Sequence, residues 1–144
     1  MVNHVKITAL ALSAFLSACA APTTKAPVSL YEEIGGQATI EAITDNFINE
    51  VSFNETIFQY FEKTNITRFR EKFIEHLCVD TGGPCTYTGD TMLKVHQGQN
   101  ITEADFNTTV DLLVNAMEKA GLSYPQQNRV LQILAPMRKE MLYK

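Results

Sequence analysis

The chain has 144 residues, of which 45% are hydrophobic and 19% are charged, and it contains three cysteines and no tryptophan. This length and apolar content predict one folded domain rather than a disordered chain. The 16 acidic and 12 basic side chains give a net charge of −4, without any basic run. That balance argues against a nucleic-acid partner, because phosphate neutralisation needs clustered cations.

The first residues are typical of an export signal. Lys6 precedes an apolar stretch over 7–16, which is too short to span a bilayer. The sequence Leu-Ser-Ala-Cys that ends at Cys19 resembles the lipobox of bacterial lipoproteins, in which the cysteine is acylated and anchors the protein. We expect residues 1–18 to be the signal peptide and Cys19 to be the lipid anchor. The protein is then expected to be exported to the cell envelope and held at the outer membrane, facing the periplasm. An ordinary signal peptide with an incidental cysteine is the alternative.

The segment after the signal is rich in Ala, Pro and Thr and has no apolar periodicity. It predicts a tether over 19–27 before a folded domain over 28–144. Cys78 and Cys85 remain, and export favours a disulfide between them. Two free thiols or half of a metal site are the alternatives, but no second Cys/His pair stands at zinc-ligand spacing.

The first half of the domain shows helical periodicity and no convincing strand. Gly35 and Gly36 interrupt a short apolar start. A helix over about 37–51 follows, and Asn54 caps a short apolar turn. The next helix begins at Asn65 or Thr67 and runs to about Val79, with Gly82-Gly83-Pro84 after it.

The second half is also expected to be helical. Turn-forming residues fill 85–91, a short helix covers 92–97, and Gly98 stops it. Thr102 and Asp105 resemble a capping box that opens a helix to Ala120. The last helix begins near Pro125 and places four apolar residues inward: Val130, Ile133, Leu134 and Met137.

Few histidines are present: His4 is lost with the signal, leaving His76 and His96. His96 lies on the short helix between a polar loop and a long helix. A lone histidine on an apolar face is more often a core residue than a ligand, so its spacing alone gives little support for metal binding.

Four pieces of sequence, in this order, resemble group 1 truncated haemoglobins. They are 29–36 (Ser-Leu-Tyr-Glu-Glu-Ile-Gly-Gly), Tyr60-Phe61, Gly82-Gly83-Pro84 with Tyr87-Thr88-Gly89, and Met92 to Gly98 with Ile101 and Phe106. The resemblance covers the domain from about Val28 onward. It implies an all-α fold, a two-over-two helical sandwich around haem b, with His96 as the proximal ligand of the iron.

The resemblance and the chemistry of haem together predict the lining of the pocket. A flat apolar macrocycle needs large aromatic and branched walls, and the carbonyl of Met92 can orient the His96 ring. The resemblance places Thr64, Arg68 and Lys72 near the haem propionates, although a solvated helix face would carry the same residues. The haem-binding residues predicted are Phe61, Thr64, Arg68, Lys72, Phe73, Met92, Val95, Ile101 and Phe106.

The distal side departs from the family pattern. Many group 1 members place a tyrosine directly after the phenylalanine of the second helix, to bind oxygen through a hydrogen bond. Here Ile48 follows Phe47, so this donor is missing. The distal residues predicted are Ile48, Tyr60, Phe69, Phe73 and His76. Tyr60 and His76 are candidate substitutes for the donor, and Lys72 is either an internal sixth ligand or, as we prefer, a propionate partner.

These features predict a haem protein that reversibly binds oxygen, nitric oxide and carbon monoxide. Oxygen binding or transport is one role, and nitric oxide detoxification by dioxygenase chemistry, with an unidentified reductant, is another. Haem-based electron transfer or gas sensing, and a haem-free structural or interaction lipoprotein, are the alternatives. No Ser/His/Asp or Cys/His arrangement and no phosphate-binding loop suggests a hydrolase.

Overall fold

A computed structural model describes residues 27–144, and these residues form helices joined by short loops. The helices are α1 (Leu30–Glu33), α2 (Gly36–Ser52), α3 (Glu55–Phe58), α4 (Ile66–Asp80), α5 (Met92–His96), α6 (Glu103–Lys119), α7 (Tyr124–Leu134), the 3-10 helix η1 (Ala135–Met137) and α8 (Arg138–Met141). The predicted signal peptide, Cys19 and nearly all of the tether lie outside the described residues. Within 27–144, no helix has the length and apolarity needed to cross a bilayer.

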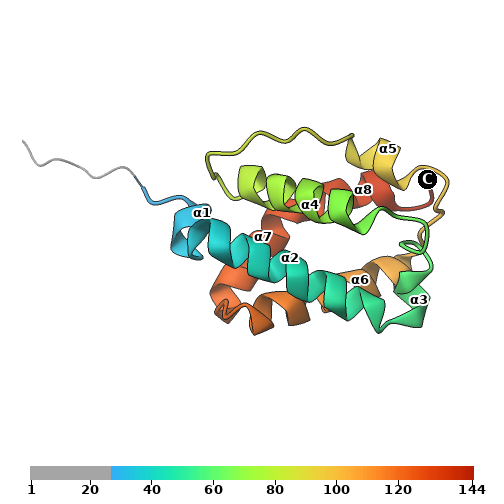
Figure 1. Cartoon of the computed structure of the whole chain (residues 1–144), viewed down its shortest axis with the longest axis horizontal. Helices are drawn as coiled ribbons and strands as arrows, with labels where there is room; N and C mark the ends of the chain where they lie inside the picture. The colour runs from blue at the N-terminus through green and yellow to red at the C-terminus, as the bar shows by residue number, and fades with distance from the viewer. Residues whose placement is uncertain (1–26) are drawn as a thin grey trace, which may run out of the picture.

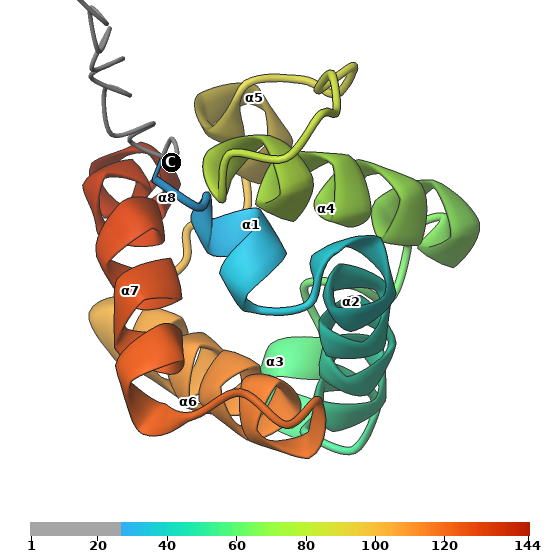
Figure 2. The ribbon, with the colours of Figure 1, turned by 90° about the vertical axis from the view of Figure 1, so that its left-hand side faces the viewer.

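The four long helices form two layers. Figures 1 and 2 show α2 and α4 on one side of the molecule and α6 and α7 on the other. Helix α2 packs against both α4 and α6 and so connects the two layers. The predicted two-over-two helical sandwich is confirmed.

Local sequence signals explain where these helices begin. The Asn65 side chain accepts a hydrogen bond from the Arg68 amide at 3.0 Å and so caps α4. Thr102 and Asp105 form the predicted capping box of α6. Between α1 and α2, Gly35 has a φ of 106°, a backbone conformation that strongly favours glycine.

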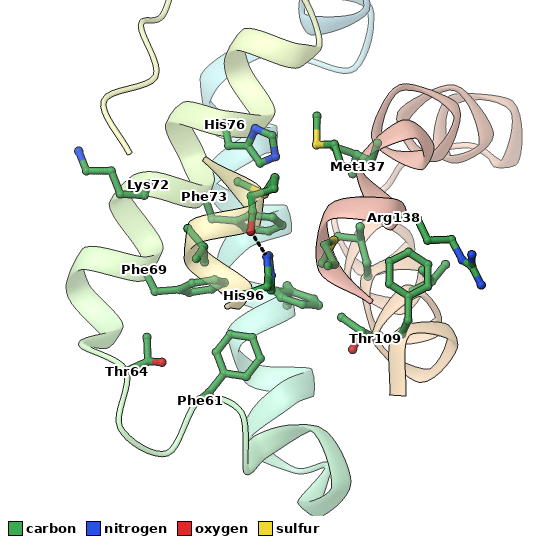
Figure 3. A pocket seen from close by; sticks show the side chains of 18 of the residues that line it. Phe61, Thr64, Phe69, Lys72, Phe73, His76, His96, Thr109, Met137 and Arg138 are labelled. Atoms are coloured by element: carbon green, nitrogen blue, oxygen red, sulfur yellow. Dashed lines mark hydrogen bonds between the residues drawn. The ribbon is translucent and has the colours of Figure 1, made fainter. Parts of the chain in front are cut away.

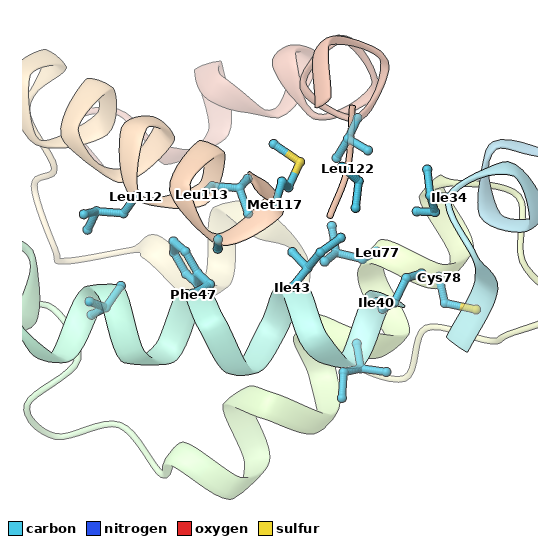
Figure 4. Packing of buried hydrophobic residues seen from close by; sticks show 14 of the residues in the cluster. Ile34, Ile40, Ile43, Phe47, Leu77, Cys78, Leu112, Leu113, Met117 and Leu122 are labelled. Carbon is cyan, nitrogen blue, oxygen red and sulfur yellow. The ribbon is translucent and has the colours of Figure 1, made fainter. Parts of the chain in front are cut away.

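The core lies where α2 meets α4 and α6. Figure 4 shows Ile40, Ile43 and Phe47 of α2 directed toward the other helices. Leu77 from α4 and Met117 from α6 complete the contact, and all five side chains are buried. Each such side chain contributes roughly 1.5–3 kcal/mol relative to an exposed position. This core fixes α4 and α6 at the spacing that the cavity described below requires.

The predicted disulfide is present. Cys78 is fully buried near the end of α4 and bonds to Cys85, with 5.9 Å between the Cα atoms. The chain turns back through Gly83, whose amide donates to the Cys78 carbonyl at 2.7 Å. A Cβ at Gly83 would stand 2.6 Å from the Cys78 sulfur, so this close approach requires glycine. The disulfide fixes the start of the α4–α5 loop, residues 81–91.

The last helix is divided, whereas the sequence predicted one helix that reaches Met137. Helix α7 begins at Tyr124, next to the expected Pro125, and ends at Leu134 before η1 and α8. Pro136 explains the change, because it lacks an amide hydrogen and its ring clashes with the carbonyl four residues earlier. Met137 still points inward, at the wall of the cavity.

Candidate functional site

A cavity of about 700 Å³ separates α4 from α6 and from the C-terminal helices. Its lining is mostly apolar and includes side chains from α4, α5, α6, α7, η1 and α8. This volume lies in the range of cofactor and ligand sites, which combine apolar walls with a few placed polar groups.

His96 lies at the end of α5 and lines this cavity. Its Nδ1 is 2.7 Å from the Met92 carbonyl oxygen, shown as the dashed line in Figure 3. Because a carbonyl only accepts, Nδ1 carries the hydrogen and Nε2 keeps its lone pair. Burial lowers the pKa of the imidazole, although the bond to Met92 opposes this shift. Burial therefore favours the neutral ring, in which Nε2 is free to bind a metal.

Four phenylalanines form a continuous wall of the cavity. The Phe69 ring lies 5.2 Å from Phe61 in an edge-to-face pair and 5.4 Å from Phe73 in a stacked pair. Phe47 of α2 stands 5.3 Å from Phe73 and 6.3 Å from Phe69. In Figure 3, Phe61, Phe69 and Phe73 are drawn around the same cavity that His96 lines. None of these four side chains can donate or accept a conventional hydrogen bond.

Lys72 contributes its stem to the cavity but turns its amine outward, as Figure 3 shows. The amine donates to Glu71 and Glu75 at 2.8 Å each and to Thr88 at 2.6 Å. Glu71 and then Glu75 raise the pKa of Lys72, and Lys72 and Thr88 lower the pKa of Glu75 to about 2. A protonated amine cannot bind iron, so this arrangement does not support Lys72 as a sixth ligand.

Most of the predicted pocket residues meet at this cavity. Those found in its lining are Phe61, Thr64, Arg68, Phe69, Lys72, Phe73, His76, Met92, Val95, His96 and Phe106. His76 has its Nδ1 3.0 Å from Asp80 and its ring 5.4 Å from the Tyr87 ring.

Three predicted residues lie elsewhere. Ile48 lines a separate cavity of about 240 Å³, which shares Phe61 and Phe69 with the large cavity. The Tyr60 hydroxyl is committed to Asp105, to which it donates at 2.7 Å, so it is not the substitute donor that we considered. Ile101 is buried and pairs with Leu142 instead of lining the cavity.

The sequence reasoning missed much of the far wall. Met137, Arg138 and Met141 line the cavity from η1 and α8, together with Val110 and Leu113 of α6. The helical spacing of Leu134 and Met137, which places both side chains inward, was the sequence signal that could have identified part of this wall. Pro136 signals a break after Leu134, but nothing in the sequence showed that the chain then returns toward α5.

The residues present fit a haem group. The cavity offers apolar walls and one imidazole nitrogen with a free lone pair. Arg68 provides a cationic group in its lining, which suits the carboxylates of haem, whereas the Arg138 guanidinium is paired with Glu103. Among residues 27–144, no cluster of three or more His, Cys, Asp or Glu is placed to hold a bare metal ion.

Comparison with known proteins agrees with this fit. Residues 29–143 match the family model "Bacterial-like globin". The chain is 34% identical to group 1 truncated hemoglobin GlbN of Mycolicibacterium paratuberculosis, over 80% of this chain and 85% of the relative. It is 25% identical to a group 1 truncated hemoglobin of Tetrahymena pyriformis, over 82% of this chain and 98% of the relative.

Solved structures show the same fold. The Fe(III) form of truncated hemoglobin from Tetrahymena pyriformis superposes with a TM-score of 0.78 at 25% identity, covering 81% of this chain and all of that one. The group II truncated hemoglobin from Bacillus anthracis superposes with a TM-score of 0.75 at 26% identity, covering 83% of this chain and 95% of that one. The chain therefore belongs to the bacterial-like globins as a truncated haemoglobin, with haem as its cofactor.

Proposed function

We propose that this protein binds haem b through His96 and takes up diatomic gases in a pocket with an apolar distal wall. The contact between His96 Nδ1 and the Met92 carbonyl carries the proposal, because it leaves Nε2 as the free imidazole nitrogen at the cavity. When bound, haem supplies an iron that coordinates oxygen, nitric oxide or carbon monoxide.

The chain's own residues position and enclose this group. Met92 fixes the His96 ring and increases its basicity as a ligand. Phe61, Phe69 and Phe73 exclude water from the distal side. Thr64, Arg68 and the stem of Lys72 lie in the lining, and we assign them to the propionates, with the Lys72 ammonium acting as a charge and not as a ligand.

The apolar wall also indicates which gases the pocket favours. Nitric oxide and carbon monoxide depend little on a hydrogen-bond donor, whereas oxygen gains stability from one. Phe47, Phe69 and Phe73 offer no donor, Tyr60 is bonded to Asp105, and the His76 Nδ1 lies 3.0 Å from Asp80. We therefore favour reversible gas binding with fast oxygen release over dioxygenase turnover, which needs long-lived oxygen binding and a reductant.

We further propose that the globin domain is lipid-anchored through Cys19 and faces the periplasm from the outer membrane. The lipobox-like sequence supports this location. The disulfide between Cys78 and Cys85 supports an oxidising compartment. Labelling cells with radioactive palmitate tests the anchor: the wild-type chain should be labelled and Cys19→Ser should not. Equal labelling of both would refute it.

The haem assignment is tested by absorption spectra of the ferric, ferrous and carbon-monoxide-treated protein. The wild type should show a globin Soret band, and His96→Ala should lose it or shift it until free imidazole is added. His76→Ala, which removes the other imidazole of the cavity, is the matched control and should retain the band. Unchanged spectra and hemin uptake in His96→Ala would refute His96 as the ligand.

A further inference from the structure

The residues after His96 are joined to residues 142–144 by backbone hydrogen bonds. The amides of Gly98 and Asn100 both donate to the Lys144 carbonyl, at 3.0 and 2.9 Å. The Tyr143 amide donates to the Ile101 carbonyl at 3.0 Å. We call residues 142–144 the strap. These three bonds hold the segment 98–101 from one side.

Helix α5 has little else to hold it. It contains five residues, none of which is fully buried, and it packs against α8. Such a short helix is not stable by itself, because the first turn costs more conformational entropy than its hydrogen bonds recover. The Thr91 side chain caps its start by accepting from the Lys94 amide. The other end, where His96 lies, depends on the strap.

Each side of this contact contains one residue with a left-handed backbone. Asn100 has a φ of 52° and Tyr143 a φ of 53°, the left-handed region that residues other than glycine seldom adopt. Such conformations persist only where surrounding contacts fix them. Here the buried pair Ile101 and Leu142, which forms an isolated parallel bridge, supplies that contact.

The strap also links His96 to the opposite wall of the cavity. It directly follows α8, and Arg138 and Met141 of that helix line the cavity. On the other side, the Gln99 amide donates to the His96 carbonyl at 3.1 Å. Movement of the strap would therefore change the position of His96 relative to the far wall.

We propose that the strap positions His96, setting the location and tilt of its imidazole for the iron. The proposal rests on the proposed function, in which His96 binds the iron. Residues that orient a metal ligand typically contribute a factor of about 10 to 100 in metal affinity. Loss of the strap should weaken haem retention and alter the iron–histidine bond without removing His96.

Truncation after Leu142 tests the proposal, since it removes the Lys144 carbonyl and the Tyr143 amide. The matched control is Lys144→Ala, which keeps the backbone carbonyl and loses only the side chain. The truncated protein should release hemin to an apoglobin acceptor roughly 10-fold faster and show a shifted iron–histidine stretching band in resonance Raman spectra. Lys144→Ala should match the wild type. The proposal would be overturned if truncation left the hemin release rate and the iron–histidine band unchanged. It would also be overturned if Lys144→Ala changed both as much as truncation does.

Amide hydrogen exchange in the haem-loaded full chain tests the strap contact even if the truncated protein does not fold. Gly98 and Asn100 should exchange far more slowly than exposed loop amides, and free exchange at both would refute the strap contact. Tyr143→Gly, which adopts a φ of 53° without strain, should keep wild-type hemin retention. If His96→Ala leaves the spectra unchanged, the proposed function fails, whereas the exchange result still reports on the strap itself.

Discussion

Replacing Phe69 with glutamine would place an amide donor in the aromatic wall of the cavity that His96 also lines (Figure 3). A hydrogen bond to a polarised ligand contributes about 1.5–3 kcal/mol. Converted to a rate, this corresponds to oxygen dissociation roughly 10- to 100-fold slower than in the wild type. Carbon monoxide carries less charge than oxygen in the same pocket, so its dissociation rate should change much less.

The same substitution has a structural cost that can be estimated from ring geometry. Phe69 pairs with Phe61 at 5.2 Å, with Phe73 at 5.4 Å and with Phe47 at 6.3 Å. Each aromatic pair contributes about 0.5–1.5 kcal/mol beyond the area that it buries. The unfolding free energy should therefore fall by roughly 1.5–4.5 kcal/mol from these three pairs. Phe69→Leu is the matched control, because it loses all three pairs and gains no donor.

Stopped-flow replacement of oxygen by carbon monoxide measures the dissociation rate in the three proteins. Fast release in the wild type and in Phe69→Leu, with slow release in Phe69→Gln, would agree with an apolar distal wall. A wild-type rate as slow as that of Phe69→Gln would refute the reasoning. It would mean that a group other than the four phenylalanines donates to oxygen.

Other predictions concern stability. Reduction of the Cys78–Cys85 disulfide should lower the unfolding free energy measured in urea by about 2.5 kcal/mol, from the entropy of an eight-residue loop. Ile43→Ala should lower it by roughly 2–5 kcal/mol, because Ile43 is 1% exposed in the core. Thr102→Ala should cost about 1 kcal/mol through the lost cap of α6. The folded pKa of Glu75 is about 2 against an ordinary 4.5, so its stabilisation is present above pH 4.5 and lost as the pH falls toward 2. Glu75→Gln should therefore be less stable than the wild type at neutral pH and should approach it in acid.

Each of these expectations has a contradicting outcome. Equal urea curves with and without reductant would show that the disulfide does not constrain the unfolded chain. Gln37→Ala, an exposed site on the same helix as Ile43, should change stability by no more than about 0.5 kcal/mol; a loss equal to that of Ile43→Ala would refute the core assignment. A Glu75→Gln difference that grows in acid would reverse the sign derived from the pKa.

Local signals in the sequence were sufficient for most of the fold. The capping residues Asn54, Asn65 and Thr102 start the helices where expected, because a side-chain oxygen in the right place satisfies free amides. The Met92 carbonyl contacts the His96 ring as expected, since residues four apart on a helix lie one above the other. These predictions depend on neighbours within one turn.

Predictions that depend on distant parts of the chain were less accurate. Ile48 follows Phe47 in α2, yet it faces the smaller cavity, because one step along a helix rotates the side chain to another face. Tyr60 finds its partner in Asp105, at the start of α6, and sequence spacing gives no sign of that contact. The roles of Arg138 and Met141 depend on how Pro136 redirects the chain.

The α4–α5 loop is attached to α4 in two chemically independent ways. Cys85 holds it by a covalent bond to Cys78, and Thr88 holds it through its amide and hydroxyl, which bond to the Glu75 carboxylate. A reductant breaks the first attachment but not the second, and acid below the pKa of Glu75 weakens the second but not the first. Proteases should therefore cut this loop readily only after the disulfide has been reduced and the pH has then been lowered below the pKa of Glu75.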